Sequence, residues 1–342
     1  MRAGSPAPTS RRLCARWRRA GSRRIFPTGR ASSNCSTRSL RGATEVPARS
    51  ALFDAAARET FERDGYARLP GLIPPPVLER LRGFFDPLLV ADWVPHKAVA
   101  DAPQGKVVTN IGRLFAWGDP APLELLALPE IMDVATAICG DDLFVVQEFA
   151  VIKNRGDATP VLWHQDMVHG RSAPCFAMGL YLDDAEPGEG ALRFVPGSHL
   201  TGEPICALAR QPAVEVPAKA GDVIVHDMMV AHSSEPMEGN ALRRVIYLEF
   251  LSVELALGES IYTREEIDNR RRLLFAARRY RRETVPGGNC FKPRQRDPSP
   301  RDRKRPVREV LADIYARSVQ PRPANYCFER IPARLDGAAS NE

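Results

Sequence analysis

The sequence predicts a mostly β fold of the sandwich or jelly-roll type, flanked by helices. Between residues 92 and 258, many short extended segments follow one another, separated by Pro, Gly and Asp. Several, such as residues 175–184, carry apolar side chains at alternate positions, the period of a half-buried strand. The chain has no G-x-G-x-x-G and no P-loop, so a βαβ nucleotide-binding fold is not favoured.

Helices are expected before these strands. Residues 50–65 are typical of a helix with Ser50 as its N-cap and Gly65 at its end. Residues 66–73 form a short predicted strand. A second helix is expected over residues 74–89, because proline is tolerated in the first turn of a helix.

The pattern becomes helical again past Gly258. Residues 263–282 open with a T-x-x-E capping box, a Pro- and Arg-rich loop or linker is expected over 286–306, and a final helix over 307–318. We expect the arginine cluster at 270–282 to be a solvated helix face. The alternative is that these arginines bind an anionic carrier or a phosphate-bearing substrate.

Charge divides the 342 residues into three parts. Residues 1–44 carry 11 Arg and no acid, residues 45–258 carry 17 basic and 30 acidic residues, and residues 259–342 carry 20 and 12. We expect a disordered basic extension, a folded catalytic domain, and a helical basic extension packing on that domain. The acidic middle would repel phosphate, which argues against a nucleic-acid partner. No apolar stretch is long enough to cross a membrane.

The first 44 residues have the composition of an organellar transit peptide. The favoured alternative is a disordered extension, or an upstream start outside the working protein. A cytoplasmic location is therefore expected, or a mitochondrion or other organelle if these residues are a transit peptide. The seven cysteines are scattered, odd in number and without a CxxC pair. They argue against a disulfide framework or a zinc ribbon and fit a reducing compartment.

His164 and Asp166 stand two positions apart in an otherwise apolar run. Residues i and i+2 of a strand share one face, so an imidazole and a carboxylate would be aimed at the same point. They would supply two ligands of a 2-His-1-carboxylate facial triad, whose open positions admit a cosubstrate and O₂. The third ligand must be a distant histidine. His232 and, as runner-up, His226 are the candidates.

A keto-acid cosubstrate needs a cation for its far carboxylate. Arginine suits this role, because its planar fork pairs bidentately and keeps its charge. Arg243 and Arg244 both stand at the start of an apolar segment, eleven and twelve residues after His232. Strand parity separates the two residues but does not say which one faces inward.

Five segments together resemble the phytanoyl-CoA dioxygenase family, whose members are Fe(II)- and 2-oxoglutarate-dependent oxygenases on a double-stranded β-helix, a cupin-like jelly roll. In order, the segments are FERDGYARLPGLI, LWHQD, GALRFVPGSH, GDVIVHDMMVAH and RRVIYLEF. The resemblance covers roughly residues 55–252, and both ends of the chain lie outside it. It makes residues 45–258 the expected dioxygenase domain.

The resemblance also assigns site residues. It implies His164, Asp166 and His232 as the iron ligands and Arg243 as the 2-oxoglutarate anchor. Gln147 and Lys153 are weaker assignments to the 2-oxoglutarate site. The implied cofactors and cosubstrates are Fe(II), 2-oxoglutarate and O₂, with ascorbate as a candidate activator.

The implied reaction is hydroxylation of an unactivated C–H bond, with release of succinate and CO₂. Halogenating relatives carry a small residue in place of Asp166, so the carboxylate favours oxygenation. The substrate is expected to be a small metabolite, an acyl-CoA or a carrier-bound molecule, and the oligomeric state is not specified. Two alternatives remain at this stage: a jelly-roll metal enzyme of isomerase type that does not use 2-oxoglutarate, and a non-catalytic binding module.

Overall fold

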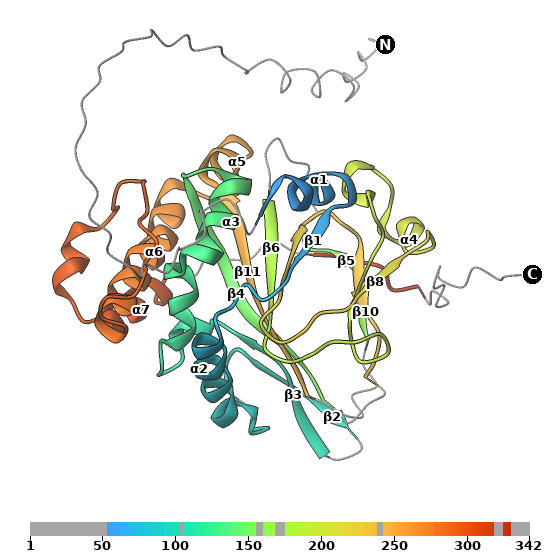
Figure 1. Ribbon diagram of the computed structural model, residues 1–342, viewed down its shortest axis with the longest axis horizontal. Helices are drawn as coiled ribbons and strands as arrows, with labels where there is room; N and C mark the ends of the chain where they lie inside the picture. Colours follow the sequence, from blue (N-terminus) through green and yellow to red (C-terminus); the bar gives the residue numbers. More distant parts are fainter. Residues whose placement is uncertain are drawn as a thin grey trace, which may run out of the picture. The chain divides into compact units, whose positions relative to one another are not determined.

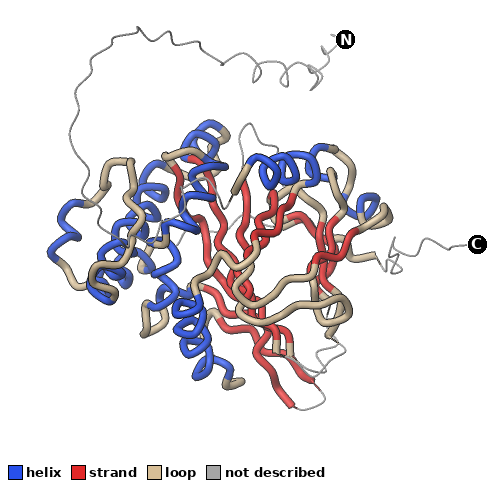
Figure 2. The backbone as a smooth tube through the Cα atoms, in the orientation of Figure 1, coloured by secondary structure: helices blue, strands red, loops and turns tan. Residues whose placement is uncertain are grey.

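The computed structural model describes residues 53–92, 94–102, 105–154, 160–167, 175–237, 242–317 and 324–329. The basic segment 1–44 and Ser50, the expected N-cap, lie outside the described residues. Two antiparallel sheets face each other, with helices around them (Figures 1 and 2). The prediction of a mostly β jelly roll with flanking helices is confirmed.

The larger sheet has seven strands in the order β1-β9-β6-β11-β4-β3-β2. In that order their bounds are Tyr66–Leu69, Val223–Asp227, Cys175–Tyr181, Arg243–Ser252, Leu143–Lys153, Gly105–Gly112 and Lys97–Ala102. The smaller sheet has the order β12-β5-β10-β7-β8. Its strands span Asn325–Tyr326, Val161–Gln165, His232–Ser234, Leu192–Phe194 and Val214–Val216.

Side chains of β11 alternate between two apolar layers. Val245 and Tyr247 belong to a buried cluster that includes Leu192 and Phe194 of the smaller sheet, so they lie between the sheets. Ile246, and with it Leu248 and Phe250 at every second position, belongs to another buried cluster. That cluster includes residues of the helices on the outer face. The inner face of the larger sheet is therefore the one that can contribute to a site between the sheets.

Helices cover the outside of this framework. They are α1 (Ala55–Asp64), α2 (Pro75–Phe85), α3 (Pro129–Cys139), α4 (Ile205–Leu208), α5 (Val253–Gly258), α6 (Arg264–Thr284) and α7 (Val307–Tyr315). The expected end of α1 at Gly65 and the capping box of Thr263 with Glu266 are confirmed. Asp54 caps α1 by accepting from the amide of Ala57. No described helix has the length and apolarity needed to span a bilayer.

The arginine cluster of α6 is only partly solvated. Arg270, Arg271 and Arg272 are buried against the outer face of the sheet and the loops beside it. Arg270 donates to the carbonyl of Val145 on β4 and pairs with Glu148, and Arg272 pairs with Asp302 at 2.7 Å. The expectation of a solvated face is wrong for these three residues, because internal carboxylates compensate their charges.

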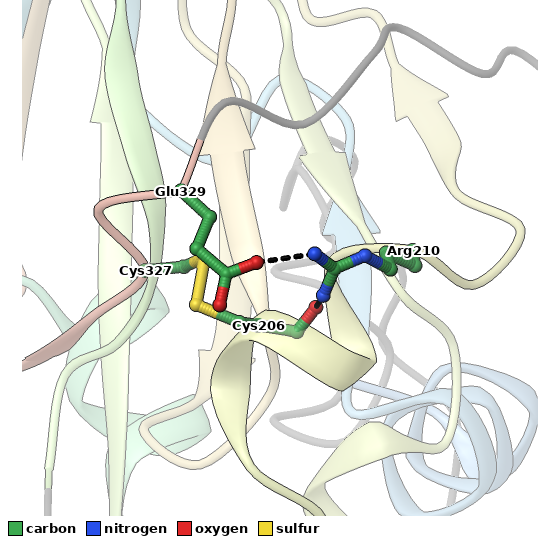
Figure 3. Close-up of a disulfide and its surroundings, with 4 residues drawn as sticks. All are labelled: Cys206, Arg210, Cys327 and Glu329. Carbon is green, nitrogen blue, oxygen red and sulfur yellow. Dashed lines mark hydrogen bonds and ion pairs between the residues drawn. A yellow bond between two sulfur atoms is a disulfide. The ribbon is translucent and has the colours of Figure 1, made fainter.

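The structure also corrects the expectation about cysteines. Cys206 of α4 and Cys327, directly after β12, form a disulfide across 121 positions of sequence (Figure 3). Among the described residues, Cys290 is not part of a disulfide. The odd number and wide scatter of the cysteines did not reveal this pair, because the fold alone brings two such distant segments together.

Candidate metal centre and cosubstrate site

His164 and His232 face each other across neighbouring strands. They are paired in the register of β5 with β10, and their ring centroids lie 4.0 Å apart. Asp166 follows the end of β5, and its amide donates to the carbonyl of Met228, which fixes the backbone there. One ligand atom from each of these three residues lies within 4.8 Å of the others. The structure therefore brings together the three residues that the sequence predicted as ligands.

Backbone carbonyls set the protonation of both imidazoles. Nδ1 of His164 lies 2.8 Å from the carbonyl oxygen of Leu162, and Nδ1 of His232 lies 3.0 Å from that of Val230. A carbonyl oxygen only accepts hydrogen bonds, so each Nδ1 carries the proton and each Nε2 keeps a free lone pair. These Nε2 atoms lie 3.3 and 3.7 Å from Oδ1 of Asp166.

The electrostatics of the site favour metal-binding forms. Burial would raise the pKa of Asp166, but His232, His164 and His226 outweigh it and hold that pKa well below its ordinary value. Burial lowers the pKa of His232 well below its ordinary value, and His164 lowers it further. A carboxylate beside two imidazoles is the donor set of a 2-His-1-carboxylate ferrous site, so the residues fit Fe(II).

His226, the alternative third ligand, has a different position. It extends from β9, and its Nε2 lies 2.9 Å from Oδ2 of Asp166, the carboxylate oxygen that faces away from His164 and His232. Among the described residues it is not part of the three-residue group. This contact orients the carboxylate, as a neighbour of a metal ligand commonly does.

Arg243, and not Arg244, faces the space between the sheets. Its guanidinium lies over the ring of Tyr181, 5.7 Å from the centroid. Its Nε and Nη1 atoms and the Tyr181 hydroxyl are buried without hydrogen-bond partners among the residues that the structure describes. Arg244 points to the outer face, where it pairs with Asp183 at 2.8 Å. A buried guanidinium with free donors fits the carboxylate of a bound cosubstrate.

Lys153 and Gly190 lie beside this guanidinium. Lys153 of β4 is paired in register with Arg243, and its Nζ donates to the carbonyls of Ser234 and Glu235. Because Ser234 is the last residue of β10, these hydrogen bonds connect Lys153, the neighbour of Arg243, to the strand that carries His232. A Cβ atom on Gly190 would lie 3.3 Å from Cδ of Arg243 and 3.2 Å from Cδ of Lys153. The glycine therefore allows both side chains to pack closely.

Gln147 lies on the inner face of β4, in register with Glu249 of β11. Its Nε2 donates to Oε1 of Glu249 at 2.7 Å. Burial raises the pKa of Glu249 well above its ordinary value, and the charge of Asp166 raises it further. Glu249 is thus a buried, neutral carboxyl within electrostatic range of Asp166, which the sequence did not indicate.

Other residues near the motif have structural positions. Trp163 packs on the outer side of the smaller sheet with Cys327, and Met167 belongs to a buried apolar cluster. His199 lies in a 3-10 turn (Ser198–Leu200), with its Nε2 3.3 Å from the carbonyl of Glu62. His169 and Arg171, which follow this motif closely, lie outside the described residues.

The sequence reasoning missed some residues of the site. Tyr181, Gly190, Ser234 and Glu249 were assigned no role, although Gly190 and Glu249 lie within the segments GALRFVPGSH and RRVIYLEF. Ser234 could have been found, because it stands two positions after His232 and so shares its strand face. Its hydroxyl oxygen is buried without a hydrogen-bond partner in the described part of the chain.

A model of the phytanoyl-CoA dioxygenase family matches residues 61–245, more than half of the chain. Two curated relatives agree with this match. The chain is 26% identical over 210 residues to the dioxygenase lolE1 of Epichloe uncinata, covering 55% of this chain and 79% of the relative. It is 24% identical over 237 residues to the ectoine dioxygenase of Nocardia farcinica, covering 58% and 78%.

Two solved structures are similar to this chain in fold. AviO1 from Streptomyces viridochromogenes Tue57 superposes with a TM-score of 0.53 at 28% identity, covering 60% of this chain and 98% of AviO1. EvdMO1 superposes with a TM-score of 0.53 at 28% identity over 58% of this chain. The chain spans half of the length of EvdMO1. The residues matched by the family model include His164, Asp166 and His232, and the match extends past Arg243. The chain belongs to the phytanoyl-CoA dioxygenase family and is a 2-oxoglutarate-dependent dioxygenase.

Proposed function

We propose that this dioxygenase holds Fe(II) through His164, Asp166 and His232, binds 2-oxoglutarate through Arg243, and hydroxylates an unactivated C–H bond. The substrate is a small metabolite, an acyl-CoA or a carrier-bound molecule, and the products include succinate and CO₂. The observation that carries the proposal is the combination of two imidazole Nε2 atoms and one carboxylate with a buried guanidinium whose Nε and Nη1 have no partner among the described residues.

When bound, Fe(II) supplies the oxygen-activating chemistry, and the protein supplies binding, orientation and exclusion of water. The Leu162 and Val230 carbonyls hold both imidazoles in the metal-binding tautomer. His226 fixes the second carboxylate oxygen of Asp166, which keeps the first oxygen directed at the imidazoles. Each of these contacts reduces the reorganisation needed on metal binding.

Arg243 would receive the far carboxylate of 2-oxoglutarate. Its Nε and Nη1, which have no partner among the described residues, could donate two hydrogen bonds to one carboxylate, and the buried hydroxyls of Tyr181 and Ser234 offer further contacts. Lys153 would position the arginine and add positive charge. Gln147 would contact the cosubstrate from β4, on the side where it now donates to Glu249.

The isomerase-type alternative, a metal enzyme without 2-oxoglutarate, is less favoured. Within the described residues it would leave the buried Arg243 guanidinium without an anionic partner, and such a charge is costly. The use of O₂, activation by ascorbate, a cytoplasmic or organellar location, the absence of a nucleic-acid partner, and the division at residues 44 and 258 remain predictions that belong to this proposal.

The test is anaerobic binding of Fe(II) and 2-oxoglutarate to the purified chain, followed by succinate release in O₂ against a substrate panel. We expect the wild type to bind both and His232→Ala to lose metal binding and turnover. His199→Ala, outside the three-residue group, should bind metal as the wild type does. Metal binding by His232→Ala equal to that of the wild type would contradict the ligand assignment. Metal-dependent turnover without succinate would favour the isomerase alternative.

A further inference from the structure

The C-terminal strand β12 lies against the strand that carries the metal-site histidine. Asn325 pairs in register with Gln165, and Tyr326 pairs with His164. The amide of Cys327 donates to the carbonyl of Trp163 at 2.8 Å. β12 thus forms the edge of the smaller sheet beside β5, although 160 positions separate Asn325 from Gln165. This region lies outside the residues matched by the family model.

Tyr326 covers one face of a metal-site imidazole. Directly paired residues of adjacent strands project to the same side of a sheet, so Tyr326 and His164 share the side that faces Asp166 and His232. Their rings are stacked, with centroids 4.9 Å apart and an interplanar angle of 13°. His232 lies on the other side of His164, at 4.0 Å. The imidazole of His164 is therefore held between two rings.

Among the described residues, this edge strand is held by the disulfide, a short ladder and the packing of Cys327 beside Trp163. β12 has two residues in the ladder with β5, and a two-residue ladder is weak by itself. The disulfide joins Cys327 to Cys206 of α4, and Arg210 of the same region donates to Glu329 and to the carbonyl of Cys206 (Figure 3). The Arg210–Glu329 pair is exposed and contributes little. Cys206 is partly accessible, so a reductant can reach the bond.

We propose that β12 is a redox-controlled wall of the metal site: the Cys206–Cys327 disulfide holds Tyr326 against His164, and its reduction releases the strand. Tyr326 is then a positioning residue for His164. A dithiol reductant breaks the S–S bond by transferring two electrons and two protons, which gives two cysteine thiols and one disulfide in the reductant. Without the link, Tyr326 can leave the imidazole, and His164 gains freedom and solvent access. The inference rests on the proposed function, because it takes His164 as a metal ligand.

The first experiment uses the full-length, metal-free chain and does not depend on metal binding. Hydrogen exchange is compared between the oxidised protein and protein reduced with dithiothreitol, which is removed before the measurement. We expect faster exchange at the amide of Cys327 after reduction. In Cys206→Ser we expect the fast rate without reductant and no further change on its addition. Equal exchange in oxidised and reduced wild type would overturn the proposal.

The second experiment measures the release of Co(II) from the loaded protein to a chelator. Loss of a group that supports a metal ligand weakens metal binding about 10- to 100-fold. We therefore expect reduction to accelerate release by about 10-fold. Tyr326→Ala should show the fast release even when oxidised, and reduction should add little to it. Tyr326→Phe keeps the stacked ring and should release Co(II) at the slow rate.

The exposed Phe328→Ala is the matched control, because Phe328 lies two residues along the same segment and has no ring contact with His164 among the described residues. It should behave as the wild type in both states. If reduction retains its full effect on release in Tyr326→Ala, the disulfide does not act through Tyr326 and the proposal is wrong. If the wild type takes up no Co(II), the proposed function fails, and the exchange experiment still decides whether the disulfide holds the strand.

Discussion

Arg243 and Arg244 are consecutive on β11 and extend to opposite faces of the seven-stranded sheet. Arg243 lies between the sheets beside Tyr181. Arg244 lies on the outer face, where its Nε and Nη2 atoms donate to the two carboxylate oxygens of Asp183 at 2.8 and 2.9 Å. The Arg244 guanidinium thus has a carboxylate partner, whereas the buried Nε and Nη1 of Arg243 have no hydrogen-bond partner in the described part of the chain. This difference assigns different roles to two adjacent, identical side chains.

Replacing Arg243 should weaken the binding of 2-oxoglutarate. A hydrogen bond to a charged group contributes about 1.5–3 kcal/mol, so Arg243→Ala should raise the KM for 2-oxoglutarate roughly 10- to 100-fold. Arg243→Lys should recover part of the loss, because it keeps the charge but not the fork. The measurement is succinate release as a function of 2-oxoglutarate concentration.

Arg244→Lys is the control for this prediction. It breaks the bidentate contact with Asp183, so the melting temperature should fall while the KM for 2-oxoglutarate stays unchanged. An increase in KM with Arg244→Lys and none with Arg243→Ala would reverse the assignment.

A methyl group on Gly190 should disturb the same site. Gly190 has a φ of 80°, which strains an L-residue by about 1–2 kcal/mol. The added Cβ would also press on Lys153 and Arg243 at 3.2 and 3.3 Å. Gly190→Ala should therefore lower both the melting temperature and the affinity for 2-oxoglutarate, as measured by thermal unfolding and by calorimetric titration.

Gly188→Ala separates strain from displacement. Gly188 has a φ of 77°, and nothing lies within 4 Å of the position of its Cβ. It should show a similar loss of stability with an unchanged affinity for 2-oxoglutarate. Equal affinities in both variants would show that close packing at Gly190 does not position Arg243.

The sequence predicted the parts of this site that depend on local spacing. A strand places residues i and i+2 on one face, so His164 and Asp166 could be recognised together. The orientation of Arg243 could not be predicted from parity, because all ten residues of β11 are buried. Helices cover one face of this strand and the smaller sheet covers the other, so no polar face marks the outside.

Long-range features were the least predictable. The Cys206–Cys327 disulfide depends on β12 joining the sheet from the end of the chain. The burial of Arg270 depends on Glu148, which lies 122 positions away on β4. Glu249 stands in an apolar strand segment whose pattern gives no sign of a partner for a carboxyl. In each case the partner is chosen by the fold and not by the neighbouring residues.

Glu249 should make the stability of the metal-free protein depend on pH. Its folded pKa is raised well above its ordinary value by burial and by Asp166, whereas the unfolded pKa is about 4.3. Near pH 4 both states keep the proton. As the pH rises, the unfolded state loses the proton first, so stability falls until the folded pKa is passed.

Glu249→Gln removes this titration and can still accept from Gln147. The variant should match the wild type near pH 4 and be more stable at pH 7, and the difference should grow by at most about 1.4 kcal/mol per pH unit. Thermal unfolding across this range measures it. The exposed Glu59→Gln should show no such trend, and a wild type more stable than Glu249→Gln at pH 7 would contradict the prediction.

The buried pair of Arg270 and Glu148 should be a main attachment of α6 to the sheet. Arg270 also donates to the carbonyl of Val145, and its guanidinium lies 5.3 Å from the ring centroid of Tyr315, whose hydroxyl donates to Glu148. Removing one member of a buried pair leaves an uncompensated charge, so Arg270→Met should lower the free energy of unfolding by about 3–5 kcal/mol.

The double variant Arg270→Met/Glu148→Met tests the cause of that loss. It removes both charges and replaces them with apolar side chains, so it should be more stable than Arg270→Met alone. The exposed pair of Arg294 and Asp141 provides the control, because Arg294→Ala should cost at most about 1 kcal/mol. Urea unfolding followed by circular dichroism compares the wild type, the two single methionine variants, the double variant and Arg294→Ala. Glu148→Met could instead lower the stability of the wild type and of Arg270→Met by the same amount. The two residues would then act independently, and the pair would not attach α6.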